Sequence, residues 1–137
     1  MVIDEIGRPT EVEAARTCKN RGVRLIASAH GGLRSLVKNR ALRGLIGDVQ
    51  QVTVGDEQAK ADAKRHGGPL EKTKAERAGP PIFEIIVEVE PGRHNEWTII
   101  MNSGEAVDRI LMGEEYKVQK RGRNPSTGMV HMALSLA

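Results

Sequence analysis

The sequence predicts an α/β domain built around a parallel sheet. Apolar, β-branched runs at residues 2–3 and 23–28 alternate with amphipathic helical segments that follow each run. Polar side chains stand directly after both runs, where the carboxyl ends of parallel strands line a ligand crevice. The length of 137 residues fits one domain, and an aromatic content of 2% leaves Val, Ile, Leu, Ala and Met to build its core.

The first half of the chain is predicted to run strand, helix, strand, helix. After the first run, Pro9 suits the first turn of a helix, whose acidic start and basic end match the helix dipole. Gly22 is expected to end this helix. Residues 23–28 then form the second strand, and residues 33–39 and 41–46 form two short helices.

The second half is predicted to hold a hairpin between two irregular segments. Residues 49–54 alternate as a strand, whereas residues 55–81 are polar, contain glycines and prolines, and are expected to form a flexible insert. Residues 82–90 and 97–102 read as a β-hairpin turning at Pro91–Gly92, and Ser103 is expected to cap a helix over 104–112. Residues 114–137 are basic, then rich in Gly, Pro and Ser, and are expected to be a disordered tail.

Charge is segregated along the chain although the net charge is only +3. Residues 16–47 hold eight of the 21 basic residues and no acidic residue, which leaves 13 basic and 18 acidic residues, a net charge of −5, in the rest. Such a basic block indicates a polyanion partner, either nucleotide phosphate or a nucleic-acid backbone. The alternative is a pair of solvated helix faces.

The acidic pair Asp4–Glu5, at the end of an apolar strand, is the first candidate site. P-loop ATPases place an Asp that holds Mg²⁺ through its water shell and a Glu that polarises the attacking water at such an edge. Ser28 and His30, after the second strand, are expected at the same edge, where they can sense a phosphate by hydrogen bonding. An acidic pair at a strand end is more often the N-terminal cap of the next helix, and a lone loop histidine is usually a surface residue.

Several blocks together carry a resemblance to a known family: VIDEIG, EAA and RGV before LIASAHG, VTVGDEQA, and KTKAERAGPPIFEIIVEVE before EAVDRIL. Over residues 2–113 the chain resembles AAA-type P-loop ATPases similar to stage III sporulation protein AA, in the branch found in cyanobacteria and plastids. A C-terminal Arg-x-x-x-His nucleic-acid-binding domain commonly follows in that branch. The resemblance implies that residues 1–54 are the second half of a RecA/AAA-like parallel sheet and that residues 82–113 form a hairpin plus helix.

The resemblance also implies roles for individual residues, with ATP and Mg²⁺ as cofactors. Asp4 becomes the metal ligand, Glu5 the catalytic carboxylate, and Ser28 with His30 a sensor pair. Four cations become phosphate or intersubunit contacts: Arg34, Lys38, Arg40 and Arg43. The complete protein is expected to be a homo-oligomer in the chloroplast, with the cytoplasm as the alternative location.

The chain departs from that family pattern in its phosphate loop. No GxxxxGK[ST] occurs, since Lys72–Thr73 follows Glu71 rather than glycine, and no Arg-x-x-x-His domain is present. We therefore expect a fragment of an ATP-hydrolysing enzyme that is inactive alone. The alternative function is a non-enzymatic module that binds nucleic acid or protein through basic residues 16–43.

Composition excludes several further classes of protein. The longest apolar stretches are too short to span a membrane, and no targeting leader is visible. With Cys18 as its one cysteine the chain forms no internal disulfide, and its four histidines show no metal-ligand spacing. One residue each of Phe, Trp and Tyr is too few for a base-stacking platform of several rings.

Overall fold

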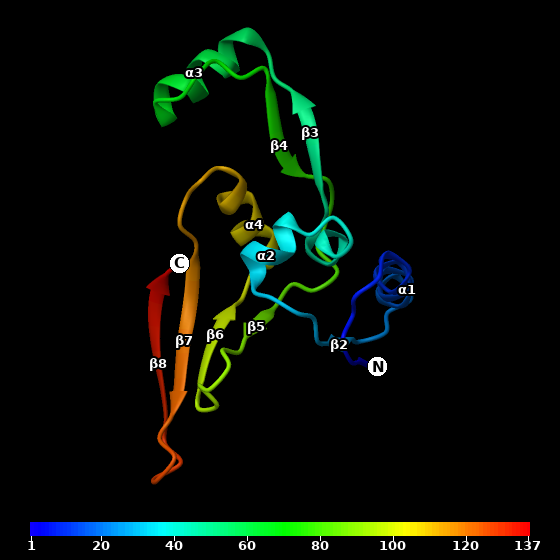
Figure 1. The fold of residues 1–137 in the computed structure, drawn as a ribbon, viewed down its shortest axis with the longest axis vertical. Coiled ribbons are helices and arrows are strands. Elements are labelled where there is room, and N and C mark those ends of the chain that lie inside the picture. Colours follow the sequence, from blue (N-terminus) through cyan, green and yellow to red (C-terminus); the bar gives the residue numbers. More distant parts are fainter.

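The computed structural model describes residues 1–137 and contains three small sheets around a mixed helical centre (Figure 1). The sheets have the strand orders β1-β2, β3-β4 and β5-β6-β7-β8, and only β1-β2 is parallel. The prediction of an α/β fold is confirmed in this coarse form. The extended parallel sheet is not found, because each strand of the parallel pair has two residues and the other sheets are antiparallel.

The N-terminal unit is the predicted strand–helix–strand. Strand β1 (Val2–Ile3) pairs with β2 (Ile26–Ala27), and helix α1 (Pro9–Asn20) connects them. Proline at the first helical position and the Glu11 carboxylate, which accepts hydrogen bonds from two backbone N–H groups, explain why α1 begins here. Gly22 follows the helix with a φ of 80°, as expected of a residue that ends a helix.

Two short helices follow and carry the chain to the centre of the molecule. Helix α2 (Leu33–Lys38) and the 3₁₀ helix Arg43–Ile46 lie within the two predicted helical segments. Both bury their leucine and isoleucine side chains in the core.

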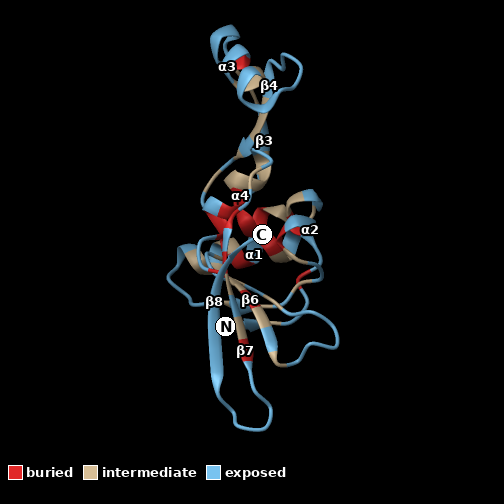
Figure 2. Cartoon of the chain, turned by 90° about the vertical axis from the view of Figure 1, so that its left-hand side faces the viewer, coloured by how far each residue is buried: buried red, intermediate tan, exposed pale blue.

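The predicted flexible insert contains regular structure. Strand β3 (Val49–Thr53) pairs with β4 (Thr73–Arg77), and helix α3 (Asp56–His66) connects them at the end of the molecule far from the core (Figures 1 and 2). The segment reads as irregular because α3 is polar nearly all round and Ala59 is its one buried residue. Two acids in its first turn and three basic residues in its last stabilise it locally through the helix dipole.

The predicted hairpin and helix are both present. Strand β5 (Ile86–Glu88) pairs with β6 (Glu96–Ile100), and helix α4 (Ser103–Leu111) follows. The cap of α4 differs from the prediction, because the Asn102 side chain accepts the hydrogen bond from Glu105 N at 3.0 Å. Ser103 lies inside the helix and donates its hydroxyl to the carbonyl of Phe83.

The prediction of a disordered tail over 114–137 is wrong. Strand β7 (Lys117–Arg123) pairs with β6 and with β8 (Val130–Leu136), which completes the four-stranded antiparallel sheet. The Gly/Pro/Ser-rich stretch is the turn of this hairpin, in which the Asn124 side chain accepts bonds from the N–H groups of Ser126 and Thr127. The Gly, Pro and Ser residues that suggest disorder in the sequence are the residues of this turn.

One face of the four-stranded sheet packs on the core. Its inward side chains, such as Ile100 and Val118, join a cluster with α1, α2, α4 and the 3₁₀ helix (Figure 2). Only 21 of 137 residues are buried, so a large apolar area stays at the surface. No helix of the chain has the length and apolar character needed to cross a membrane.

Candidate functional site

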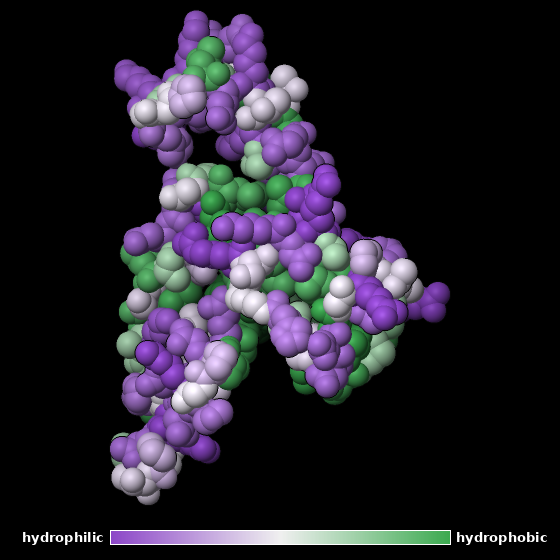
Figure 3. All heavy atoms as spheres, viewed as in Figure 1, coloured by the Kyte–Doolittle hydropathy of each residue, from purple (hydrophilic) through white to green (hydrophobic).

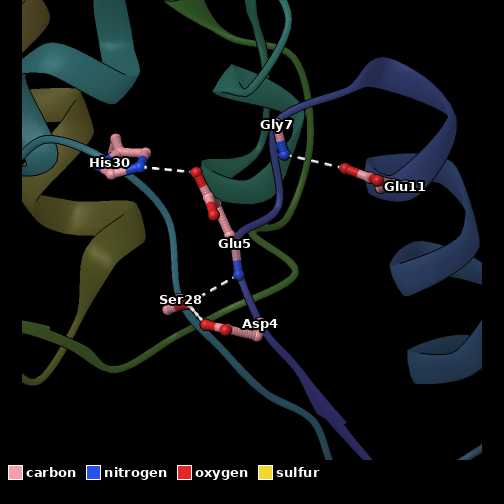
Figure 4. Close-up of polar contacts among 6 residues, drawn as sticks. All are labelled: Asp4, Glu5, Gly7, Glu11, Ser28 and His30. Atoms are coloured by element: carbon pink, nitrogen blue, oxygen red, sulfur yellow. Dashed lines mark hydrogen bonds and ion pairs between the residues drawn. The ribbon is translucent and has the colours of Figure 1, made fainter.

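The structure brings Asp4, Glu5, Ser28 and His30 together where β1 and β2 end (Figure 4). The Ser28 hydroxyl donates to Asp4 Oδ1 at 2.7 Å and accepts from Glu5 N at 2.8 Å. Glu5 has a φ of 57°, which turns its side chain away from Asp4 and toward His30, where Oε1 lies 2.8 Å from Nε2. Ser28 thus ties the two strand ends together.

This cluster opens into a solvent-accessible hollow beside the start of α1. The hollow has a volume of about 610 Å³ and includes Glu5, Glu11, His30 and Asn39 in its lining. The Glu5 and His30 side chains are 67% and 88% exposed, so water screens their interaction and it contributes little to stability. The backbone N–H groups of Gly7 and Arg8 donate to Glu11 and thereby lower the pKa of that carboxyl.

The acidic side chains of the polar cluster have different hydrogen-bond partners. No group of three or more His, Cys, Asp or Glu side chains is placed to hold a metal. The roles of Asp4 as a metal ligand and of Glu5, Ser28 and His30 in catalysis stay untested predictions.

The basic side chains of segment 16–43 have different partners and do not gather at the polar cluster. Three of its cations pair with carboxylates: Arg16 with Glu13, Lys19 with Glu84, and Arg43 with Asp48. Four others form no ion pair: Arg21, Arg24, Lys38 and Arg40.

Arg34, the remaining cation of the segment, lies over an aromatic ring. Its guanidinium is 5.3 Å from the ring centre of Tyr116, which is close enough for a cation–π interaction. Burial raises the pKa of Tyr116, and the Glu88 carboxylate adds to the rise. None of Arg34, Lys38, Arg40 and Arg43 lines the hollow beside the polar cluster.

A second candidate surface is the outer face of the β5–β8 sheet, which sequence reasoning missed. Strand pairing places Trp97 opposite Arg121, and Arg121 opposite Met132. The neighbouring rows on the same face are Val87, Ile99, Gln119 and Leu134; Lys117 and Leu136; and Arg123 and Val130. We call these residues the outer face.

The outer face is apolar and cationic, and none of its strand residues is acidic. Val87, Val130, Met132, Leu134 and Leu136 are each 52% to 77% exposed. Figure 3 shows the molecule from one side, with hydrophilic surface over much of the β5–β8 sheet and hydrophobic surface along its β8 margin. Three cations share the face, and none pairs with a carboxylate: Arg121 donates to Gln119, Arg123 donates to Asn95, and Lys117 has no bonded partner.

The sequence carries one signal for this face that escaped notice. Apolar residues occupy every second position from Val130 to Leu136, which is the two-residue period of a strand. In β7 the corresponding positions hold Lys117, Gln119, Arg121 and Arg123, so a cationic strand face looks like an unstructured basic run. Only the register with β8 shows that the two rows share one surface.

Comparison with known proteins finds three curated relatives. The chain is 43% identical to an uncharacterized protein ycf45 of Porphyra purpurea over 122 residues, 88% of this chain and 20% of that protein. It is 41% identical to the protein SEEDLING PLASTID DEVELOPMENT 1 of Arabidopsis thaliana over 83% of this chain and 16% of that protein. A ycf45 protein of Cyanidium caldarium is 34% identical over 88% of this chain and 34% of its own length.

The chain therefore spans between 16% and 34% of the length of the relatives that it matches. No family model matches it, and neither does any solved structure. The predicted resemblance to AAA-type P-loop ATPases is wrong by these findings, and so is the predicted ATP-hydrolysing function, because the similar proteins carry other names. The predicted chloroplast location is supported, since the Arabidopsis protein is named for plastid development.

Proposed function

We propose that this chain is a binding module for single-stranded nucleic acid and that the outer face is its contact surface. The observation that carries the proposal is the placement of three cations free of carboxylates and one tryptophan on a single uncovered sheet face. Phosphates attract the cations of Lys117, Arg121 and Arg123, and a base stacks on the ring of Trp97.

The apolar neighbours favour a single strand over a duplex. In a duplex the base faces are stacked on one another and only phosphates and groove edges are presented, so Met132 and Leu134 would meet no apolar partner. An unpaired strand offers its base faces to such side chains. A four-stranded sheet is also broader than the α-helix or two-stranded ribbon that enters the major groove of a duplex.

The outer face has no means of reading a base sequence in detail. One tryptophan is its only aromatic ring, and two of its polar side chains, Gln119 and Arg121, are bonded to each other. Binding is therefore expected to be indifferent to sequence and to weaken with salt. A mononucleotide such as ATP presents one base and one short phosphate chain, so it should compete poorly with a longer strand.

Fluorescence anisotropy with a labelled single-stranded homopolymer tests the proposal at several salt concentrations. A plot of log affinity against log salt should have a slope of about −2, because each of three phosphate contacts adds about −0.7. Replacing Lys117, Arg121 or Arg123 by Gln should each make the slope shallower by about 0.7 and weaken binding at low salt.

Arg40→Gln is the matched control, because Arg40 is exposed and forms no ion pair but belongs to the basic segment after α2 and not to the outer face. It should leave affinity and slope unchanged. If Arg40→Gln weakens binding while Arg121→Gln does not, the outer face is not the contact surface and the proposal fails. Absence of any binding at low salt also contradicts it.

A further inference from the structure

The outermost strand of the sheet, β8, presents an unpaired and unprotected edge. All seven of its residues are exposed, and the strand contains no Pro, Lys, Arg, Asp or Glu. Natural edge strands usually carry charge or proline, which prevents pairing with another strand. The opposite edge of the same sheet is protected, because β5 has three residues, ends in Glu88 and is followed by Glu90 and Pro91.

The backbone hydrogen bonds show which groups of β8 are free. Tyr116 and Ala137 exchange both of their backbone bonds, at 3.1 and 2.9 Å, so the odd-numbered residues of β8 direct N–H and C=O toward β7. The even-numbered residues therefore direct theirs outward: Val130, Met132, Leu134 and Leu136. The same residues carry the apolar side chains of the outer face.

We propose that β8 is a dimerisation edge that pairs antiparallel with β8 of a second copy, with Ala133 on the two-fold axis. This register opposes Val130 to Leu136 of the other copy and Met132 to Leu134 of the other copy. Every outward N–H and C=O of these residues then exchanges hydrogen bonds, and every apolar side chain has an apolar neighbour across the interface. Ala133 meets its own counterpart in a pair without hydrogen bonds, in which the Cα atoms are about 4.5 Å apart.

Charge favours this edge-to-edge arrangement over stacking of two outer faces. Stacking would set Lys117, Arg121 and Arg123 of one copy against those of the other. In the edge pair two β8 strands separate the β7 strands, which then lie about 14 Å apart, beyond the screening length of about 8 Å at physiological salt. The pairing is isologous and closes at two copies, because the β5 edge is protected.

Cysteine crosslinking tests the register directly. In a Cys18→Ser background, Ala133→Cys should form a disulfide-linked dimer on mild oxidation, because the two Cα atoms fall within the range that a disulfide spans. Ser135→Cys is the matched control on the same strand and face. Its two copies lie about 13 Å apart in the proposed register and should not crosslink.

Light scattering during size-exclusion chromatography measures the assembly without a crosslink. The unaltered chain should be a dimer at high concentration, and Ala133→Glu should be a monomer, because the two introduced carboxylates would meet at the axis. Within one copy the carboxylate lies opposite Lys120, so the variant should fold, and circular dichroism checks this. A monomeric unaltered chain, an assembly larger than two, a dimer that survives Ala133→Glu, or equal crosslinking of Ser135→Cys would each overturn the proposal.

Discussion

At the scale of single residues, the start of α1 is held by one side chain. The Glu11 carboxylate accepts two hydrogen bonds from backbone N–H groups, from Gly7 at 2.9 Å and from Arg8 at 3.0 Å. These contacts favour the charged carboxylate and lower its pKa below the ordinary value of 4.5. A negatively charged side chain also interacts favourably with the N-terminal end of the helix.

We expect Glu11→Gln to lower the melting temperature at neutral pH and to have a smaller effect in acid. A carboxyl whose pKa is lower in the folded state stabilises the fold above its unfolded pKa, and this contribution disappears as pH falls through the folded pKa. The melting temperatures of the two proteins, followed by circular dichroism, should therefore start to converge as pH falls below about 4.5 and coincide below the lower folded pKa of Glu11. Glu13→Gln on the same helix is the control, and an equally pH-dependent loss there would contradict the assignment.

Single residues also explain how far the polar cluster was predictable. Asp4, Glu5, Ser28 and His30 were expected at one sheet edge, because parallel strands place their carboxyl ends together, and the structure has them there. The positive φ of Glu5 was not readable from the sequence, and it directs the carboxylate to His30 instead of a site shared with Asp4. The sequence therefore predicts that these residues lie together, but it does not predict where their side chains point.

At the scale of elements, one ion pair connects the projecting β3–α3–β4 unit to the body of the molecule. Arg77 at the end of β4 donates to both carboxylate oxygens of Asp108 in α4, at 3.0 and 2.9 Å, and also to the carbonyl of Gly79. The Asp108 side chain raises the pKa of Arg77. Bidentate geometry of this kind is stronger than a single surface contact.

We expect Arg77→Met to destabilise the fold by about 1 to 2 kcal/mol, a value reduced from that of a fully buried pair because Asp108 is 38% exposed. The measurement is urea unfolding of the purified variant. Arg93→Met is the control, since Arg93 is 62% exposed and pairs only with nearby Glu90 and Glu96. The free energy of unfolding should fall by less than about 1 kcal/mol in Arg93→Met. Equal losses in the two variants would contradict a special role for the Arg77–Asp108 ion pair.

Elements with local signals were the predictable ones. Helix α1 has proline and acid at its start and glycine after its end, and the β5–β6 hairpin turns at Pro91–Gly92. Helix α3 has no apolar face against the core, and Val118 is the one side chain of the β7–β8 hairpin in the core cluster. Strand β7 is stabilised by pairing with β6 and β8, and its own alternation of Lys, Gln and Arg on one face gives no apolar signal.

At the scale of the whole molecule, the proposed function rests on the surface that the fold leaves uncovered. The sequence predicted the α/β class and a basic polyanion-binding segment at 16–43, but the structure pairs part of that segment with carboxylates. Three further cations without a carboxylate partner share the outer face with exposed apolar side chains, and the register between β7 and β8 places them there. Binding of a partner would bury apolar area that folding leaves exposed.

Fluorescence of Trp97, the only tryptophan of the chain, tests the central proposal most directly. Because this ring lies on the outer face opposite Arg121, a stacked base should quench its emission as a single-stranded homopolymer is added. The quenching should saturate with the affinity measured by anisotropy and weaken in Arg121→Gln. Binding seen by anisotropy with no change in Trp97 emission would place the nucleic acid elsewhere and contradict the account.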